Sequence, residues 1–140
     1  VALISQIHPL PSLQEKEIAP SEWENSWKSH FTPLHVGKRM VIVAPFHSLK
    51  LDHQKIPITL DPGLAFGTGH HPTTFQCLKS MESLVKPGCR VLDVGSGSGI
   101  LTIAAAKLGA ARTIALDSDP IAVRVGRANF KINKISITKN

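Results

Sequence analysis

A short apolar stretch followed by alternating glycines constrains the fold of this chain more than any other feature. Residues 91–94 are apolar except for Asp93, and Gly95, Gly97 and Gly99 follow before a helical pattern begins. Glycines allow a tight turn and let the backbone approach a ligand closely. The following helix presents unpaired N–H groups and its positive dipole end there. The stretch therefore predicts a nucleotide-type cofactor site at the carboxyl end of a parallel strand.

The pattern around and after the glycines predicts alternating strands and helices. A helix is expected from about residue 98 to residue 108, and Gly109 occupies its C-terminal cap position. A buried strand is expected at 113–116, and a third strand at 135–138 after a second helix. Strand, helix, strand, helix and strand at this spacing indicate a right-handed parallel α/β array that begins with the strand 90–94.

Both helices of this array have recognisable faces and ends. In the second helix, Asp119 is a suitable N-cap and Pro120 suits the first helical position. This helix is expected to end near Lys131. The first helix is expected to bury Ile100, Ile103, Ala104 and Leu108. The expected apolar face of the second helix comprises Ile121, Ala122, Val125 and Ala128.

The residues before the glycine turn predict a β-hairpin and one helix. Residues 40–44 form a β-type run, and residues 56–60 are a second strand candidate in which Pro57 favours an edge position. A loop rich in glycine and proline covers residues 61–74. Its last residues, Thr73-Thr74, open a helix of about 13 residues and are candidate helix caps.

Composition narrows the class of protein. Hydrophobic residues make up 42% of the 140 residues and charged residues 19%, which is typical of a globular protein. The formal net charge of +6 indicates a solvated surface or one that works near RNA or an acidic partner. No dense basic run with interleaved aromatic residues is present, so direct nucleic-acid recognition is not expected.

Several other classes of site and location are disfavoured. Cys77 and Cys89 lack the spacing of a metal site and do not suggest a disulfide framework. The adjacent His70 and His71 have no acidic or cysteine companion, so a structural loop role before Pro72 or a place in the lining of the active site is preferred to a metal site. No apolar run approaches the roughly 18 residues of a membrane span, and no signal-peptide pattern is present. We expect a cytoplasmic protein.

The spacing of the glycines distinguishes two kinds of cofactor. A dinucleotide fingerprint requires G-x-G-x-x-G, but Ile100 occupies the third glycine position, which disfavours a nicotinamide-dependent oxidoreductase. The pattern D-x-G-x-G-x-G from Asp93 to Gly99 resembles the first motif of class I S-adenosylmethionine-dependent methyltransferases. Asp117, at the end of the next strand, can accept hydrogen bonds from both ribose hydroxyls. Capping of the next helix by Asp117, and a structural role for Asp93 in the turn, remain alternatives.

A wider set of residues carries a family resemblance. The signature comprises Leu60-Asp61-Pro62-Gly63-Leu64-Ala65-Phe66-Gly67-Thr68-Gly69 with His71-Pro72-Thr73-Thr74, preceded by Trp27-Lys28 and followed by Leu92-Asp93-Val94-Gly95, Leu108-Gly109-Ala110, Asp117-Ser118-Asp119-Pro120 and Asn129. Across roughly residues 20–135 the chain resembles the ribosomal protein L11 methyltransferase family (PrmA). Two positions depart from the family pattern: His70 replaces a usual threonine, and Ser96 a frequent cysteine.

The resemblance implies a fold and a domain organisation. The fold would be Rossmann-like α/β, of the class I methyltransferase type, with a partial parallel sheet of the first three strands preceded by a β-hairpin and a helix. Residues 1–30 would be a linker and the tail of a missing N-terminal recognition domain. Residues 31–140 would form the first half of the catalytic domain. The motif that lines the acceptor pocket would lie beyond the C-terminus, so catalytic residues are not assigned and the chain alone is expected to be inactive.

The resemblance also implies an activity and a site. The enzyme would transfer methyl groups from S-adenosylmethionine to lysine side chains and the N-terminal amine of ribosomal protein L11, with no metal and no membrane partner. The residues expected to bind the cofactor are Phe66, Gly67, Thr68, Gly69, Thr74, Asp93, Gly95, Gly97, Gly99 and Asp117. Alternatives are a methyltransferase of the same class that acts on another protein or a small amine, and a non-catalytic fragment.

Overall fold

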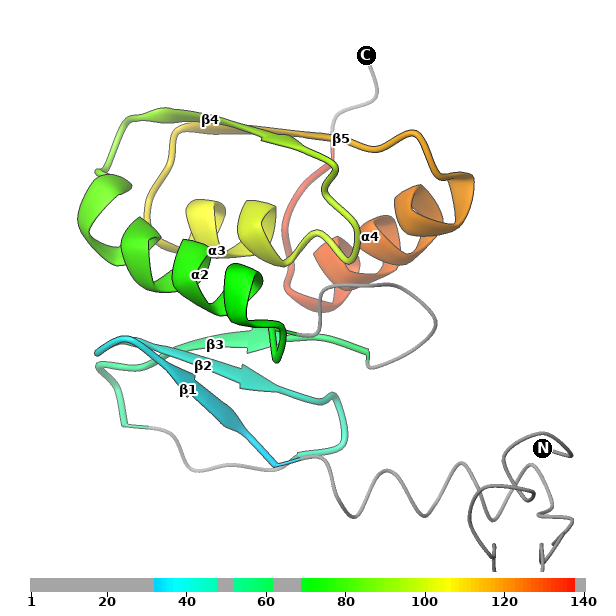
Figure 1. Ribbon diagram of the computed structural model, residues 1–140. Helices are drawn as coiled ribbons and strands as arrows, with labels where there is room; N and C mark the ends of the chain where they lie inside the picture. Colours follow the sequence, from blue (N-terminus) through cyan, green and yellow to red (C-terminus); the bar gives the residue numbers. More distant parts are fainter. Residues whose placement is uncertain (1–31, 48–51, 62–68, 138–140) are drawn as a thin grey trace, which may run out of the picture. The chain divides into compact units, whose positions relative to one another are not determined.

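The computed structural model describes residues 32–47, 52–61 and 69–137 (Figure 1). All of them lie in one compact unit, Thr32–Asn140. The predicted linker and domain tail at residues 1–30 lie outside the described residues, so the predicted domain organisation stays a prediction. No helix among the described residues has the length and apolar character needed to cross a membrane.

The first sheet contains three strands in the order β1 (Leu34–Val36), β2 (Met40–Val43) and β3 (Ile56–Thr59). All four residues of β2 are buried, as a central strand requires, and β3 with its proline lies at the edge as predicted. The predicted hairpin is present, but β1 and β2 form it.

β2 and β3, the two strands that the sequence predicted, pair in parallel. The prediction that these two strands form the hairpin is therefore wrong. The physical reason is the connection between these strands, Ala44–Lys55, which is long enough for the chain to cross over and re-enter the sheet in the same direction.

The second sheet contains β4 (Arg90–Val94) and β5 (Arg112–Leu116), which pair in parallel. The predicted third strand does not form over residues 135–137, and Thr138 lies outside the described residues. The backbone N–H of Ile135 donates instead to the carbonyl of Phe130, which closes the end of the preceding helix. This bond removes a donor that a strand would use in its ladder.

In the described part of the chain, three helices accompany the strands: α2 (Pro72–Leu84), α3 (Ile100–Lys107) and α4 (Pro120–Ile132). Helix α3 packs against β3 as well as β4 and β5, so it lies between the two sheets (Figure 1). The predicted buried residues of α3 are confirmed. The core combines them with side chains of the first sheet, of Leu60 just after it and of α2, including Ile42, Ile58 and Leu78.

The predicted apolar face of α4 is only partly correct. Ala122 is buried and Val125 is half-buried, but Ile121 and Ala128 are exposed. The buried line of the helix runs instead through Ala122, Gly126 and Asn129. The periodicity of apolar residues did not predict this buried face, because Asn129 is polar.

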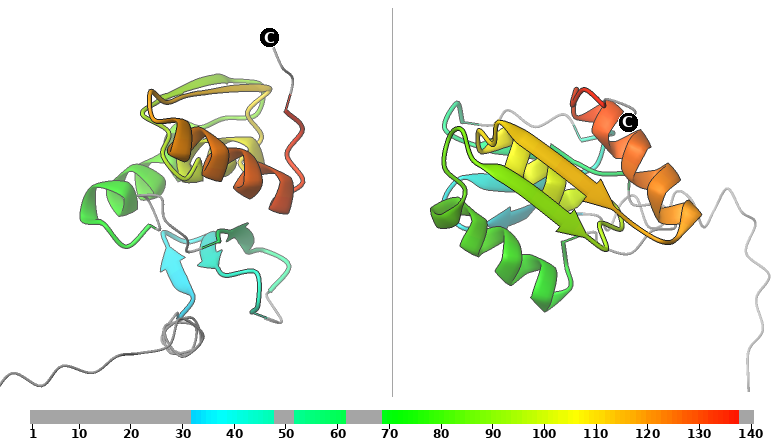
Figure 2. Two further views of the ribbon diagram at one scale, coloured as in Figure 1. Left: turned by 90° about the vertical axis from the view of Figure 1, so that its right-hand side faces the viewer. Right: turned by 90° about the horizontal axis from the view of Figure 1, so that it is seen from above.

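The face of the second sheet that points away from α3 is uncovered among the described residues (Figure 2, right). Leu92 and Val94 of β4 are 59% and 74% exposed, and Ile114 and Leu116 of β5 are 38% and 51% exposed. This apolar face contrasts with the opposite one, on which Asp93 is buried against α3.

Candidate functional site

The glycine turn joins β4 to α3 and is held against the end of β5. The backbone N–H groups of Gly95 and Ser96 both donate to the carbonyl of Leu116, at 2.8 and 3.0 Å. Gly99 is the N-cap of α3 and has a φ of 79°, in the left-handed region. The turn therefore lies at the carboxyl ends of two parallel strands, where the sequence placed it.

Helix α4 packs closely against this turn. A Cβ on Gly126 would lie 3.4 Å from the carbonyl oxygen of Gly97, and one on Gly99 would meet the ring of Phe130. Gly99 is therefore required for the approach of the helix to the turn, and Gly126 leaves room for little more than a methyl group. By contrast, a Cβ on Gly95 would have no neighbouring atom within 4 Å, so space for a ligand exists beside the turn at that residue.

Asp93 is buried beneath the turn. Its Oδ2 accepts the backbone N–H of Thr102 at 3.1 Å and the hydroxyl of Thr102 at 2.7 Å. A carboxylate in this position satisfies a free donor at the start of α3 and interacts favourably with the helix dipole. This geometry corresponds to the structural alternative for Asp93, and direct contact with a cofactor stays a prediction.

Asp117 follows β5 and reaches back to the turn. One carboxylate oxygen accepts the N–H of Asp119 at 2.9 Å and the other accepts the N–H of Gly97 at 2.7 Å. These N–H donors hold the pKa of Asp117 below its ordinary value, although partial burial opposes them. An ionised carboxylate has about four acceptor positions, so Asp117 retains capacity for a further hydroxyl donor while it keeps these bonds. Asp119 takes the capping role at α4, where it accepts the N–H of Ile121.

Gly69, the last residue of the glycine-rich segment before α2, lies beside the glycine turn. Gly69 is buried with a φ of 88°, and a Cβ there would overlap Cδ1 of Ile42 and lie 3.3 Å from Cδ1 of Ile100. Because Ile100 is the first residue of α3, this end of the segment lies beside the glycine turn. Phe66, Gly67 and Thr68 lie outside the described residues, so their predicted contacts with a cofactor stay predictions.

The start of α2 differs from the prediction in its cap. His71 is the N-cap, and its Nδ1 accepts the N–H of Thr73, so neither threonine caps the helix. Pro72 occupies the first helical position. Thr74 is half-buried in the first turn of α2, which packs against α3. Its predicted contact with the cofactor stays a prediction. The part of the chain that the structure describes contains no group of three or more His, Cys, Asp or Glu residues able to hold a metal ion.

Two asparagines, Asn129 in α4 and Asn133 at its C-cap, connect segments of the fold and were not singled out as site residues by sequence reasoning. Asn129 bridges Ser98 in the turn and Asp61 after β3, while Asn133 pairs with the backbone of Thr59. Both lie on the buried face of the helix, four residues apart. The sequence signal that could have indicated them is the spacing of two amide side chains at i and i+4, which places both on one face of a helix.

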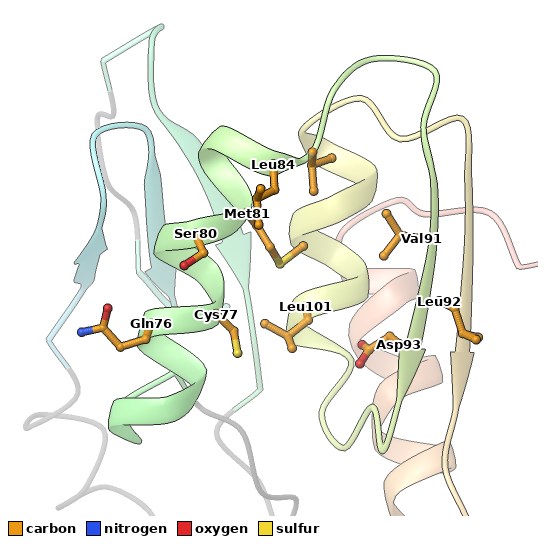
Figure 3. A pocket seen from close by; sticks show the side chains of 10 residues that line it. Gln76, Cys77, Ser80, Met81, Leu84, Val91, Leu92, Asp93 and Leu101 are labelled. Carbon is orange, nitrogen blue, oxygen red and sulfur yellow. The ribbon is translucent and has the colours of Figure 1, made fainter.

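A cavity of about 430 Å³ lies between α2 and the free edge of β4 (Figure 3). Met81 and Leu84 of α2 line one side, and Val91 and Leu92 of β4 line the other. Most of its lining side chains are apolar, unlike the N–H and carboxylate groups of the turn. We therefore assign the candidate cofactor site to the turn and Asp117 rather than to this cavity.

Comparison with known proteins decides the family. The family profile described as "Ribosomal protein L11 methyltransferase (PrmA)" matches residues 3–139. The chain belongs to this family. Membership of the ribosomal protein L11 methyltransferase family confirms the resemblance that the sequence motifs carried.

Individual relatives agree with this family. A curated ribosomal protein L11 methyltransferase from Chloroflexus aurantiacus is 50% identical over 132 residues, which are 94% of this chain and 40% of that protein. One from Staphylococcus epidermidis is 52% identical over 121 residues, or 86% and 39% of the two chains. The chain thus spans about 40% of the length of these curated relatives.

A solved structure supports the fold. The crystal structure of a ribosomal protein L11 methylase from Lactobacillus delbrueckii subsp. bulgaricus matches with a TM-score of 0.69 and 34% identity. The match covers 75% of this chain and 54% of the other. The chain therefore has a partial Rossmann-like α/β fold of the class I methyltransferase type, with the strand corrections described above.

Proposed function

We propose that this chain is part of an enzyme that transfers methyl groups from S-adenosylmethionine to lysine side chains and the N-terminal amine of ribosomal protein L11. The observation that carries the proposal is the contact between Asp117 and Gly97, which unites the acidic residue after β5 with the glycine turn after β4. Membership of the family supports the substrate. This substrate also supports a cytoplasmic location, where ribosomes are assembled.

The residues present fit the proposed cofactor. Open space beside Gly95 allows a ligand to lie against the backbone of the turn, and Asp117 has unused acceptor capacity for a ribose hydroxyl. Gly69 and Thr74 come from the segment that ends beside α3, and we propose that they border the same site together with Phe66, Gly67 and Thr68. We propose for Asp93 a role through α3, because its carboxylate holds Thr102.

Methyl transfer to an amine depends more on how the two reactants are positioned than on acid–base groups of the protein. When bound, S-adenosylmethionine supplies an activated methyl group on a sulfonium centre. The chain's own task is to hold that group in line with the acceptor amine and to exclude water. A lysine has an ordinary pKa of about 10.4, so desolvation near the acceptor is needed to make the neutral amine available.

The test uses the full-length polypeptide that carries this sequence. Calorimetry with S-adenosylmethionine, S-adenosylhomocysteine and NAD should show binding of the first two and none of NAD. Incubation with radiolabelled S-adenosylmethionine should label ribosomal protein L11. L11 whose amines have been acetylated should remain unlabelled, because acetylation removes the nucleophile.

Each outcome has a defined meaning. Binding of NAD alone would overturn the cofactor assignment. Cofactor binding without labelling of L11, together with labelling of a different protein or a small amine, would retain the methyltransferase but replace its substrate. Labelling of acetylated L11 would exclude amines as the acceptor groups.

A further inference from the structure

Asn129 is a wholly buried amide in the last turn of α4. Its Nδ2 donates to the carbonyl of Ser98 at 2.9 Å, and its Oδ1 accepts the backbone N–H of Asp61 at 3.1 Å. Ser98 belongs to the glycine turn, and Asp61 lies two residues beyond the end of β3. One side chain therefore joins two segments of the candidate site that are far apart in the sequence.

The neighbouring contacts strengthen this junction. Gly126 and Phe130, on the same helix, pack against Gly97 and Gly99. At the far end of the glycine-rich segment, Gly69 packs against Ile100 at the start of α3. The segment that begins at Asp61 and ends at Gly69 is thus fastened at both ends to residues in or next to the turn.

Burial makes the Asn129 amide sensitive to change. A buried polar atom that loses its partner costs about 1–3 kcal/mol, and Asn129 satisfies a carbonyl and an N–H at once. A replacement that cannot do both removes the bond from Asn129 to the Ser98 carbonyl or to the Asp61 N–H. The turn and the segment after β3 are then free to separate, without any loss of a group that contacts the cofactor.

We propose that Asn129 is a positioning residue for cofactor binding, because it holds the glycine turn at Ser98 in register with the backbone at Asp61. This inference rests on the proposed function, since the cofactor is the one proposed above. Asn129 acts through these two backbone groups and does not itself contact the reacting atoms.

Asn133 provides a matched control from the same helix. Its Oδ1 accepts the N–H of Thr59 at 2.9 Å and its Nδ2 donates to the carbonyl of Thr59, so it fastens β3 to α4. None of its described bonds reaches the turn. A role limited to stability predicts equal effects at Asn129 and Asn133, whereas positioning of the turn predicts an effect on affinity at Asn129 alone.

The experiment compares three variants of the full-length polypeptide with the wild type. Asn129→Leu removes both bonds, and Asn133→Leu is its control. Asn129→Asp keeps the acceptor for Asp61, and in its neutral form it also has an O–H donor for Ser98. Burial raises the pKa of a carboxyl group by up to several units, so this variant should change from neutral to ionised within the range of pH 5.5 to 8.5.

Dissociation constants for S-adenosylmethionine are measured by calorimetry across that range, at a temperature where circular dichroism shows every variant folded. Asn129→Leu should bind about tenfold more weakly at every pH, as expected for the loss of about 1.4 kcal/mol. Asn129→Asp should bind nearly as well as wild type at pH 5.5 and about tenfold more weakly at pH 8.5. Asn133→Leu should lower the melting temperature but retain the wild-type dissociation constant.

Other ionisable groups lie on the segments that surround this region: Asp61 after β3, Asp93 on β4 and Asp117 after β5, with His70 and His71 before α2 and Lys107 at the end of α3. Wild type and Asn129→Leu are titrated in parallel, which removes their common contribution. Amide hydrogen exchange without cofactor gives a second measurement. Exchange at Gly97 and Gly99 should accelerate in Asn129→Leu and not in Asn133→Leu.

Wild-type affinity in both Asn129 variants, or equal losses in Asn129→Leu and Asn133→Leu, would overturn the positioning role. Failure of the wild type to bind S-adenosylmethionine would instead overturn the proposed function. In that case hydrogen exchange still decides whether Asn129 holds the turn. If Asn129→Asp does not fold at high pH, Asn129→Leu and its exchange rates decide the question alone.

Discussion

The carboxylate of Asp117 accepts the backbone N–H of Gly97 at 2.7 Å. This bond links the end of β5 to the turn after β4, so the two parts of the candidate cofactor site are positioned by each other. Because the pKa of Asp117 lies below its ordinary value of about 3.9, the side chain is an acceptor throughout the physiological range.

Replacement of Asp117 tests its predicted contact with the ribose. Asp117→Ala should weaken the binding of S-adenosylmethionine to the full-length polypeptide by about tenfold or more, because charge-assisted hydrogen bonds are lost. Asp117→Asn keeps one acceptor oxygen and should show a smaller loss. Calorimetry gives the affinities. Unchanged affinity in Asp117→Ala would show that the residue only supports the turn.

Gly69 tests how closely the glycine-rich segment approaches the core. Gly69→Ala should destabilise the fold by about 2–4 kcal/mol, because the positive φ costs about 1–2 kcal/mol and overlap with Ile42 adds to it. Gly88 is the matched control, since it has a similar φ of 86° but no atom within 4 Å of a built Cβ. Gly88→Ala should therefore show the backbone cost alone. Urea denaturation measures both, and equal costs would refute close packing at Gly69.

Glu82 tests the attachment of α2 to the first sheet. Its carboxylate accepts the backbone N–H groups of Lys38, Arg39 and Met40, in the turn between β1 and β2. Burial raises the pKa of Glu82, but these three donors lower it more, so the pKa lies below its ordinary value. Glu82→Gln should reduce the free energy of unfolding at pH 7 by about 1–3 kcal/mol, because charged acceptors are lost.

The sign of the pH dependence follows from the lowered pKa of Glu82. The stabilising contribution is fully present above the unfolded pKa of about 4.3 and is lost as pH falls through the folded pKa. The difference in unfolding free energy between wild type and Glu82→Gln should therefore be constant from pH 7 to about 5 and shrink below about 4.3. A difference that grows on acidification would contradict this account.

Thr102 tests the buried attachment of Asp93. Thr102→Val keeps the shape of the side chain but removes the hydroxyl that donates to Asp93, and should cost about 1–3 kcal/mol. Thr102→Ser keeps the hydroxyl and loses one methyl group, so its cost should be smaller, about 1 kcal/mol. Thermal unfolding of the two variants distinguishes hydrogen bonding from packing, and a larger loss in Thr102→Ser would favour packing.

The features that the sequence predicted best depend on signals from neighbouring residues. The alternating glycines, the Asp119 cap and the C-terminal Gly109 each require only a few adjacent positions, and the structure confirms them. Asp93 and Asp117 were predicted as site residues from local signals in the same way. Their hydrogen-bond partners were not, because those partners come from other elements.

The features that the sequence did not predict depend on distant contacts or on atypical residues. The partners of Asn129 lie 31 and 68 positions away, so periodicity could not indicate a buried amide. The expected third strand was displaced by the end of α4, where Lys134, the residue after the C-cap Asn133, has a φ of 59° at a position where glycine is the usual signal. The parallel pairing of β2 and β3 depends on the path of their connection rather than on either strand.

The uncovered sheet face has a practical consequence. Leu92 is paired in register with Ile114, and Val94 with Leu116, so the four side chains form one continuous apolar strip across two strands. Strips of this kind promote contact between molecules. The isolated 140-residue polypeptide should therefore sediment faster as its concentration rises. Replacement of Leu92 and Leu116, on the two strands of the strip, by aspartate should restore a sedimentation coefficient that does not change with concentration. Self-association of the polypeptide therefore measures how much apolar surface this sheet leaves uncovered.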